Sequence, residues 1–490
     1  MKNYTYILIM VLLGMGSLSC SNFLEERDQD KFVPNLVDHY AALMLQEFNS
    51  NTGITNIYSL MTDEVAETGS KRIAYYANRL SMKPLYAWQR DIEQREDGQT
   101  VSSNAAVWQA LYRRIAIVNY VLAEIDNAEG SPNEIAFTKG EAYFIRAYCY
   151  FYLTNLYAEP YESAEQARIT LGVPIRTGIA VIPTYDKDML EDCYQLIESD
   201  LTQARSLIES SGFTNKSLYH PKVATCDLLL STVKLHKKDY QGAIDAATKA
   251  IEKSALMRMG AGTENRPFIT SDNSEVLYSF VQAPLNETYM SGQSLEVNPA
   301  LYNSYHEDDL RKYQFFVLAV SGTTDEVFIY PRKANTDYTE LRTGNLRAAE
   351  AYLNRAEAYA FTNQHDKARE DMMTLLSRRY VNVSNIQIPS DNTQLITFIF
   401  QERFKELCFE LLHRWFDLRR MGESLRPEIV HIFSVADRDG NLEGVETFTL
   451  LKNDRNYTLS LPRQERENNP FIRDYERFDK LPEYIEYITF

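Results

Sequence analysis

Two Glu-x-x-His pairs have the residue types and spacing of a metal site: Glu410 with His413, and Glu428 with His431. In carboxylate-bridged di-iron proteins this spacing lies on a helix, and two further helices each add a glutamate. Glu428 follows Pro427 in a stretch that is typical of a strand, which spoils this geometry. The sequence therefore gives little support for a di-iron centre. A helix-surface or hydrogen-bonded core position is the favoured interpretation of His413.

The segment 437–441, Asp-Arg-Asp-Gly-Asn, begins like a calcium-binding EF-hand loop. Such a loop needs Gly at its sixth position and Glu at its twelfth, where this chain has Leu442 and Phe448. A hairpin turn is therefore favoured, with a loose Ca²⁺ site as the alternative. The chain contains no G-x-S-x-G, H-E-x-x-H or P-loop motif, so we predict no catalytic residue, no metal ligand and no cofactor. The spatial separation of two glycosidase carboxylates cannot be read from a sequence.

The polar, aromatic-rich stretch 49–98 is the best candidate for ligand binding. Aromatic faces flanked by amides and guanidinium groups suit a sugar, which offers C–H faces and many hydroxyls. The alternative is that these rings pack beneath a long loop. The predicted binding residues are Tyr75, Tyr76, Asn78, Arg79, Tyr86 and Trp88.

A predicted amphipathic helix over 401–422 must position the most densely charged part of the chain. Its apolar residues recur at helical spacing, from Phe404 through Trp415 to Leu418, and Gly422 ends the pattern. The polar side alternates in sign, and Glu410 with Arg414 would form a favourable i,i+4 pair. We interpret the charged residues as a buried ion network that docks this helix onto the rest of the chain.

Helical hairpins account for most of the remaining chain. Amphipathic helices are predicted at 33–48, from residue 104, after Pro132 and at 187–210. Segments 222–254 and 348–379 each carry the alternation of small and large residues that is typical of a tetratricopeptide hairpin. Between them, 261–344 is rich in loops, with β-like runs at 276–281 and 315–320, and two strands are predicted around Asp439-Gly440. The predicted fold is mainly α: a tetratricopeptide-like scaffold with a large loop-rich insert and a small β-hairpin or irregular C-terminal part.

The first twenty residues have the composition of an export signal. Lys2 precedes an apolar run of about thirteen residues, which is too short to span a bilayer, where about twenty are needed. Small residues then lead to Cys20, an arrangement that resembles a bacterial lipoprotein signal with Cys20 as the acylated residue. Ordinary cleavage that leaves an unmodified Cys20 is the alternative. We predict a signal peptide at 1–19, an N-terminal part at 20–260, an insert at 261–344, a C-terminal helical-repeat part at 345–422 and a tail at 423–490.

Composition narrows the classes of function. The chain has 490 residues, 44% of them hydrophobic, and a formal net charge of −17. This charge argues against nucleic-acid binding, which depends on neutralising phosphates. Of the five cysteines, Cys149, Cys193, Cys226 and Cys408 lie inside helical patterns without metal-ligand spacing, so we expect small core residues, with a disulfide pair as the alternative.

Several motifs, in order along the chain, resemble the SusD/RagB-like family of outer-membrane nutrient-binding lipoproteins of Bacteroidetes-type bacteria. ERFKELCFELLHRWFDLRRMG at 402–422 is similar to the family's ER..EL.fEg.RWFDL.R.G helix, and GEAYFIRAY at 140–148 to its GEA..lRA..Y motif. Residues 461–470 resemble its terminal lPip..E...NP segment, and Trp108, Tyr112, Ile115 and Asn119 have the spacing of its W...Y..I...N helix. Leu411 stands where the family usually has Gly, and one extra residue precedes Arg414, so the local packing must differ.

The resemblance implies a non-catalytic lipoprotein, anchored to the cell outer membrane and facing the cell surface. It would capture a nutrient, most often an oligo- or polysaccharide, and deliver it to a SusC-type TonB-dependent channel. In the family, aromatic residues in loops before the W...Y helix take part in ligand binding, which supports the stretch 49–98 as a region. Two other functions stay open on the sequence: a secreted glycan hydrolase on a helical scaffold, and a repeat-based protein-interaction adaptor.

Overall fold

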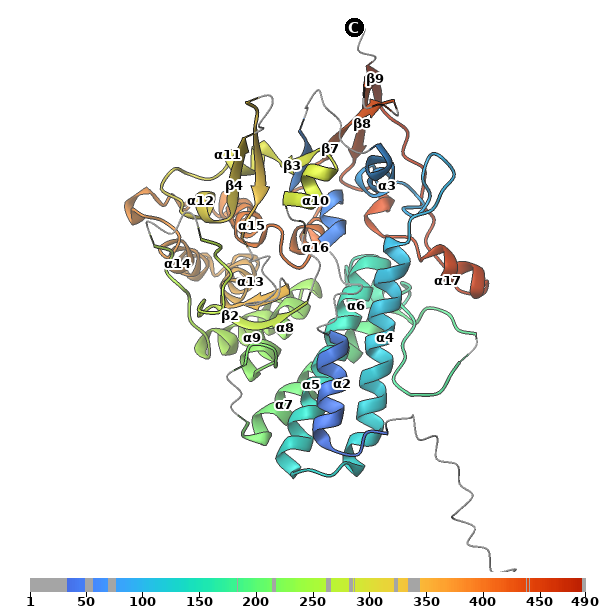
Figure 1. Ribbon diagram of the computed structural model, residues 1–490. Coiled ribbons are helices and arrows are strands. Elements are labelled where there is room, and N and C mark those ends of the chain that lie inside the picture. Colours follow the sequence, from blue (N-terminus) through green and yellow to red (C-terminus); the bar gives the residue numbers. More distant parts are fainter. Residues whose placement is uncertain are drawn as a thin grey trace, which may run out of the picture.

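The computed structural model describes residues 33–48, 56–68, 76–182, 184–213, 217–260, 266–281, 285, 287–320, 325–333, 344–437, 439 and 441–486. The predicted signal peptide at 1–19, Cys20 and Tyr75 lie outside these residues. Within the described part, no helix combines the length and apolar character that crossing a membrane would require. The chain is mainly helical, as predicted, with short two- and three-stranded sheets around the helices (Figure 1).

Long helices form the lower half of the molecule in Figure 1: α2 (Val37–Phe48), α4 (Ser103–Glu124), α5 (Pro132–Tyr157) and α7 (Leu190–Ser211). Helices α5 and α7 pack closely because Gly140 has no side chain. A Cβ atom there would lie 2.7 Å from Ile208 Cγ1 and 3.2 Å from the Ala204 carbonyl oxygen. Arg146 of α5 also binds the Asp200 carboxylate of α7 through two hydrogen bonds of 2.8 Å. The GEA..lRA motif at 140–147 therefore serves helix packing.

The W...Y..I...N spacing on α4 also has a structural explanation. Tyr112 donates a 2.7 Å hydrogen bond to the Pro174 carbonyl, and Asn119 donates one of 2.9 Å to the Arg176 carbonyl. Trp108 Nε1 donates to Glu465 in the C-terminal tail at 3.2 Å. These side chains, one or more turns apart, therefore tie the loop after α5 and the tail to the same helix.

Both predicted tetratricopeptide hairpins form. The first is α8 (Val223–His236) with α9 (Tyr240–Glu252), and the second is α13 (Ala348–Phe361) with α14 (His365–Leu376). They are separated in sequence by the insert, yet α13 packs directly on α8 and α9. Leu235, Ala243 and Ala358 form part of their shared core. Alanine at positions 243 and 358 allows the helices to approach closely, as expected from the alternation of small and large residues.

The insert and the tail supply the strands. Antiparallel pairs are β1 (Val65–Glu67) with β3 (Leu295–Val297), β2 (Val276–Phe280) with β6 (Gly344–Arg347), and β4 (Phe316–Val320) with β5 (Val327–Pro331). The predicted hairpin is β7 (Ile429–Ala436) with β8 (Leu442–Leu450), and β9 (Tyr484–Glu486) adds a third strand. Short helices complete the fold: α6 (Ala164–Ala167), α10 (Glu287–Gly292), α11 (Pro299–Asn303), α12 (Arg311–Gln314) and α17 (Arg463–Asn468).

The single helix predicted over 401–422 is wrong. Helix α15 (Asn392–Leu407) ends at Leu407, and α16 (His413–Arg420) begins after a turn in which Phe409, Leu411 and Leu412 have φ between +48° and +61°. Each such residue costs roughly 1–2 kcal/mol without glycine. Contacts from distant segments offset that cost, because Tyr152 donates a 2.7 Å hydrogen bond to the Leu411 carbonyl and Phe409 N donates one of 2.6 Å to Glu64. Leu411, where the family has Gly, thus keeps a left-handed backbone.

The predicted buried ion network is present, although its partners differ from the expected pair. Glu410 does not pair with Arg414; its carboxylate binds Arg347 at 2.8 Å and Lys333 at 2.5 Å, while Arg414 binds Asp63 at 2.6 Å. A second buried glutamate in this network, Glu406 on α15, accepts hydrogen bonds from three arginines. Burial raises the pKa of that carboxyl, but the three guanidinium groups outweigh burial and hold it well below its usual range. The residues concerned are Glu406 with Arg379, Arg347 and Arg311.

The four described cysteines are buried and free, as expected for small core residues: Cys149, Cys193, Cys226 and Cys408. The stretch 49–98 is more regular than predicted. It contains a 3-10 helix (Asn56–Met61), β1, and α3 (Tyr76–Tyr86), which includes Pro84. The sequence did not predict α3 because polar residues such as Arg79 and Lys83 interrupt its apolar pattern. In the structure these two side chains are buried.

Candidate functional site

A three-ring stack lies beneath the predicted binding stretch. The His431 imidazole of β7 lies between Tyr86 and Trp88, with ring centroids 4.1 Å and 4.4 Å away and interplanar angles of 14° and 22°. Its ring nitrogens face the Tyr86 and Thr62 carbonyl oxygens at 2.8 Å and 3.0 Å. Burial lowers the pKa of His431 to about 4, so the ring is neutral near pH 7. Glu428 is exposed, so the second Glu-x-x-His pair does not converge on one site.

Tyr86 and Trp88 belong to the core, which corrects their expected place on the surface. Each side chain is 1% exposed, and Trp88 Nε1 donates a 2.8 Å hydrogen bond to the Met61 carbonyl. Neither ring therefore presents a face to a ligand, in agreement with the alternative that these aromatics pack beneath a loop. Their local role is to fix the backbone at Trp88, where φ is +47° and the chain turns outward.

The other predicted residues have different surroundings. Arg79 is 2% exposed and binds Glu67 and the Ser434 carbonyl, with its guanidinium carbon 4.6 Å from the centre of the Phe433 ring. Asn78 is exposed on α3. The backbone of Tyr76 begins α3, but its side chain is not among those described. The structure thus brings Arg79, Tyr86 and Trp88 into one buried support and leaves Asn78 on the surface.

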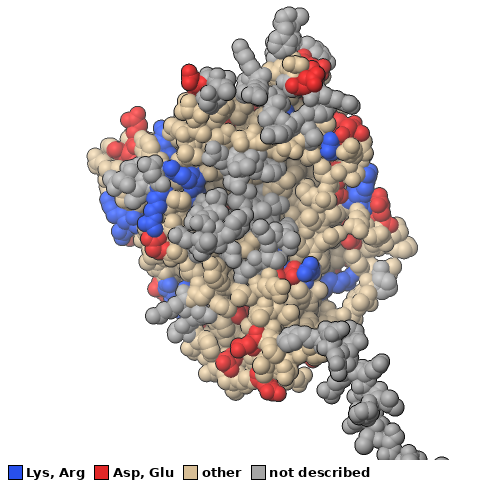
Figure 2. Space-filling model, in the orientation of Figure 1, with Lys and Arg blue, Asp and Glu red and all other residues tan. Residues whose placement is uncertain are grey.

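Residues just after Trp88 form a groove with the C-terminal tail. Gln89 exchanges two hydrogen bonds with the Lys480 backbone, at 2.9 Å and 3.2 Å, and Asn456 donates one of 2.8 Å to the Trp88 carbonyl. Two hollows of about 590 Å³ and 390 Å³ adjoin at Arg90, Asp91 and Arg463, which line both. Acidic and basic side chains stand side by side along the right edge of the face in Figure 2, where Figure 1 places α3 and α17.

Two of the groove arginines are held in place and two are available to a ligand. Arg477 is buried and donates to the Thr458 and Leu459 carbonyls, and Arg466 Nε donates to the Leu461 carbonyl at 3.1 Å. By contrast, Arg90 lies 3.5 Å from Asp479 with both side chains 60% exposed, and Arg463 lies 3.7 Å from exposed Glu467. Exposed pairs of this kind contribute little, so a ligand can replace them at small cost.

A buried hydroxyl adds a hydrogen-bonding group to the larger hollow. Ser460 is 4% exposed, and its Oγ has no hydrogen-bond partner among the described residues. Beside it, Tyr475 donates to the Leu171 carbonyl, and the Lys187 ammonium lies 4.6 Å from the centre of its ring. Burial lowers the pKa of Lys187 to about 8, although Asp474 at 3.3 Å partly offsets that shift. The groove therefore offers guanidinium, carboxylate, amide and hydroxyl groups, which suit a ligand with many hydroxyls.

The stretch 49–98 predicted from the sequence contributes Gln89, Arg90 and Asp91 to this groove, but most of the other lining residues were not predicted. Arg463 and Arg466 lie within the terminal motif at 461–470, and Gln89 and Arg90 directly follow Trp88. Nothing in the sequence indicates that the two segments meet. The candidate metal motifs have structural roles: Asp437 accepts from the Asp439 and Asn441 backbone amides at 2.9 Å, as in a hairpin turn.

The fold is a helical-repeat scaffold with a polar surface groove, and sequence comparison specifies the family. A family profile described as "Starch-binding associating with outer membrane" matches residues 22–233, and the SusD family profile matches residues 322–475. Together the matches span most of the chain in family order. The chain belongs to the SusD/RagB-like family.

Individual relatives agree with this assignment. SusD-like protein P2 of Formosa agariphila is 23% identical over 382 residues, which cover 65% of this chain and 71% of the relative. A SusD-like carbohydrate-binding protein from Bacteroides vulgatus superposes with a TM-score of 0.65 at 19% identity, over 92% of this chain and 99% of that one. A SusD superfamily protein from Bacteroides thetaiotaomicron gives 0.66 at 20% identity, over 90% and 100%. These structures share the fold.

Proposed function

We propose that this protein is a non-catalytic surface lipoprotein that captures an oligo- or polysaccharide and delivers it to a SusC-type TonB-dependent channel of the outer membrane. Family membership supports the general role, since one matching profile is described as starch-binding and a structural relative as carbohydrate-binding. The observation that carries the proposal is the pair of adjoining polar hollows around Arg90, Asp91 and Arg463.

The groove would bind a glycan mainly through hydrogen bonds. Arg90 and Arg463 would donate to hydroxyl or ring oxygens, Asp91 would accept from hydroxyls, and Ser460 Oγ would do either. Tyr86 and Trp88 would act from below by fixing the chain that carries Gln89 and Arg90. Tyr75, Tyr76 and Asn78 precede this support and would extend the site, and Arg79 would anchor α3.

A glycan array with the full chain in detergent tests the proposed ligand class and separates it from the alternatives. We expect retention of a defined set of oligosaccharides that are recovered intact. Release of shortened products, abolished by substitution of one Asp or Glu, would instead identify a hydrolase. Binding of peptides with no binding of glycans would favour the interaction adaptor.

Anchoring and delivery require separate experiments. If Cys20 carries the acyl chains, the Cys20→Ala variant should move from the outer-membrane fraction to a soluble fraction, because the protein would then have no lipid anchor. Purification of the wild-type protein from mildly solubilised outer membranes should co-isolate a large β-barrel protein. Repeated purification without such a partner would contradict the delivery step and leave glycan capture standing.

A further inference from the structure

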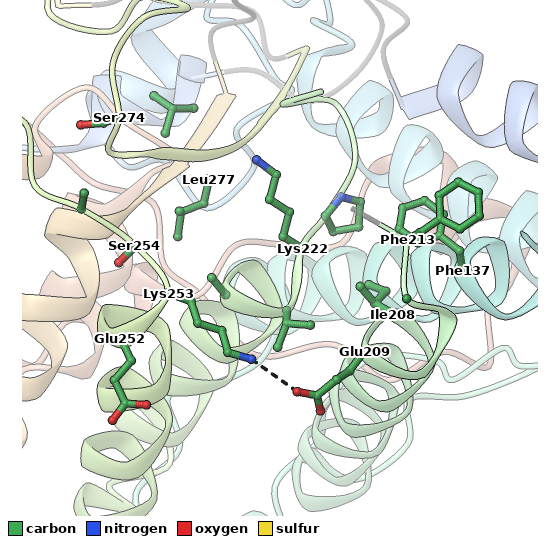
Figure 3. Close-up of a pocket in the computed structure, with 16 residues that line it drawn as sticks. Phe137, Ile208, Glu209, Phe213, Lys222, Glu252, Lys253, Ser254, Ser274 and Leu277 are labelled. Carbon is green, nitrogen blue, oxygen red and sulfur yellow. Dashed lines mark hydrogen bonds and ion pairs between the residues drawn. The ribbon is translucent and has the colours of Figure 1, made fainter. Parts of the chain in front are cut away.

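A second cavity lies on the other side of the molecule from the groove. It is bounded by the C-terminal ends of α7 and α9, the first turn of α8, and strand β2 (Figures 1 and 3). Its volume is about 910 Å³, and it shares no lining residue with the groove. A pocket of this size can enclose a small molecule or the end of a peptide.

One wall of the cavity is apolar and partly uncovered. Phe137 and Phe213 stack with ring centroids 5.3 Å apart and an interplanar angle of 28°, and Phe213 is 45% exposed. Ile208 and Leu277 continue the apolar surface (Figure 3). An exposed phenylalanine ring beside buried aliphatic side chains gains from being covered, so this wall suits an aryl or alkyl group.

The opposite side of the cavity carries one uncompensated positive charge. The Lys222 ammonium has no hydrogen bond or ion pair within the described part of the chain, and in Figure 3 it extends toward Leu277. Burial lowers the pKa of Lys222, without an acidic neighbour to offset it. The other charged groups are occupied or turned away: Glu209 pairs with Lys253 at 3.4 Å and with Arg205 at 2.8 Å, and Glu252 points out of the cavity.

We propose that this cavity binds an apolar carboxylate, which is either a free aryl or alkyl acid or the carboxy terminus of an apolar peptide. The carboxylate would pair with the Lys222 ammonium, and the apolar group would lie against Phe213 and Ile208. The positive end of the α8 dipole, at Val223, favours the same anion. This ligand class differs from the hydroxyl-rich ligand of the groove, so the two sites would work independently.

A calorimetric titration of the full chain in detergent with 3-phenylpropionate tests the proposal. We expect saturable binding that is at least tenfold weaker for 3-phenylpropionamide, which has the same shape without the charge. Lys222→Gln should weaken binding of the acid at least tenfold, and Phe213→Ala should weaken the acid and the amide alike. Lys249→Gln removes an exposed lysine from α9 outside the cavity and should leave the affinity unchanged.

A parallel titration with the tripeptide Ac-Gly-Gly-Phe, as the free acid and as the amide, distinguishes the two sources of the carboxylate. Binding of the small acid indicates a free metabolite-sized ligand, and binding of the tripeptide acid alone indicates a peptide carboxy terminus. Either result supports the proposal. It is overturned if neither acid binds, or if acid and amide bind equally. Glycan binding by Lys222→Gln should match that of the wild type. A negative result for the carboxylate ligand would therefore leave the proposed glycan site in the groove unaffected.

Discussion

Arg403 of α15 and Asp417 of α16 form a buried ion pair across the turn that separates their helices, with 2.8 Å between Nε and Oδ2. Asp417 also binds Arg420 at 2.6 Å, and Arg420 binds Glu357 of α13. The chain can therefore change direction at 408–412 while both helices stay fixed to the tetratricopeptide-like scaffold. The charged residues of the motif at 402–422 therefore hold α15 and α16 against α13 of the second repeat hairpin.

Asp417→Asn should strongly destabilise the protein. The substitution leaves Arg403 and Arg420 buried with less counter-charge, and breaking a buried pair costs about 3–5 kcal/mol. Urea unfolding followed by circular dichroism measures the effect. Asp366→Asn is a matched control, because Asp366 is fully exposed where it pairs with Arg369, and it should leave the midpoint unchanged. Equal midpoints for the two variants would contradict the proposed role of the network.

Gly140→Ala should reduce stability by about 1–3 kcal/mol, the usual cost of overpacking. The added Cβ would meet Ile208 Cγ1 and the Ala204 carbonyl of α7. Gly178→Ala is the control, since a Cβ there meets no atom within 4 Å. Adding Ile208→Ala to Gly140→Ala would remove the clash with the Ile208 side chain but not the contact with the α7 backbone. The double variant should therefore regain only part of the stability lost through the clash at Gly140. An unchanged melting temperature for Gly140→Ala would show that α5 and α7 separate easily.

Trp88→Ala should lower stability by about 3–5 kcal/mol through loss of a large core side chain. Trp88→Phe should keep most of the stacking against His431, and so keep glycan affinity within a few-fold of wild type. Thermal unfolding and glycan titration of both variants test this. A large loss of affinity in Trp88→Phe at unchanged melting temperature would mean that the indole contacts the glycan after all.

Glu64 should make stability depend on pH near neutrality. Burial raises its pKa to about 7, although the Phe409 amide and the Thr62 hydroxyl hydrogen-bond to the carboxylate. Because the folded-state pKa exceeds the unfolded value, the stabilising contribution is complete below about pH 4.5 and is lost as pH rises to about 7. The shift corresponds to about 3 kcal/mol.

Glu64→Gln removes this titration, so the stability difference between variant and wild type should change by that amount from pH 4.5 to 7.5. Urea midpoints at four pH values suffice to measure it. Parallel pH profiles for the two proteins would show that the carboxyl is ionised in the folded state throughout this range.

The helical hairpins were predictable because a repeat of apolar residues is a local property. Ala243, Ala247 and Ala250 recur on one face of α9 and predict that another helix packs closely against that face. The turn at 408–412 was not predictable, since the apolar pattern continues through it and its geometry depends on Tyr152, Arg347 and Glu64. The same holds for the site: Trp88 is buried by His431 from a distant strand.

The groove itself depends on tertiary structure in the same way. Arg90 and Arg463 adjoin because α4 holds the tail through Trp108 and because Gln89 binds Lys480. Neither contact can be predicted from the spacing of residues along the chain. Family motifs indicated the fold and the general role, whereas the residues of the proposed groove could be identified only from the three-dimensional structure.

The most direct test of glycan capture is the affinity of the Arg90→Ala/Arg463→Ala double variant for the oligosaccharide that the array identifies. Calorimetry should show at least a tenfold loss with little change in melting temperature, because both side chains are exposed and weakly paired. Arg113→Ala, which removes an exposed arginine of α4 outside the groove, should bind like wild type. Wild-type affinity in the double variant would contradict the assignment of the groove as the glycan site.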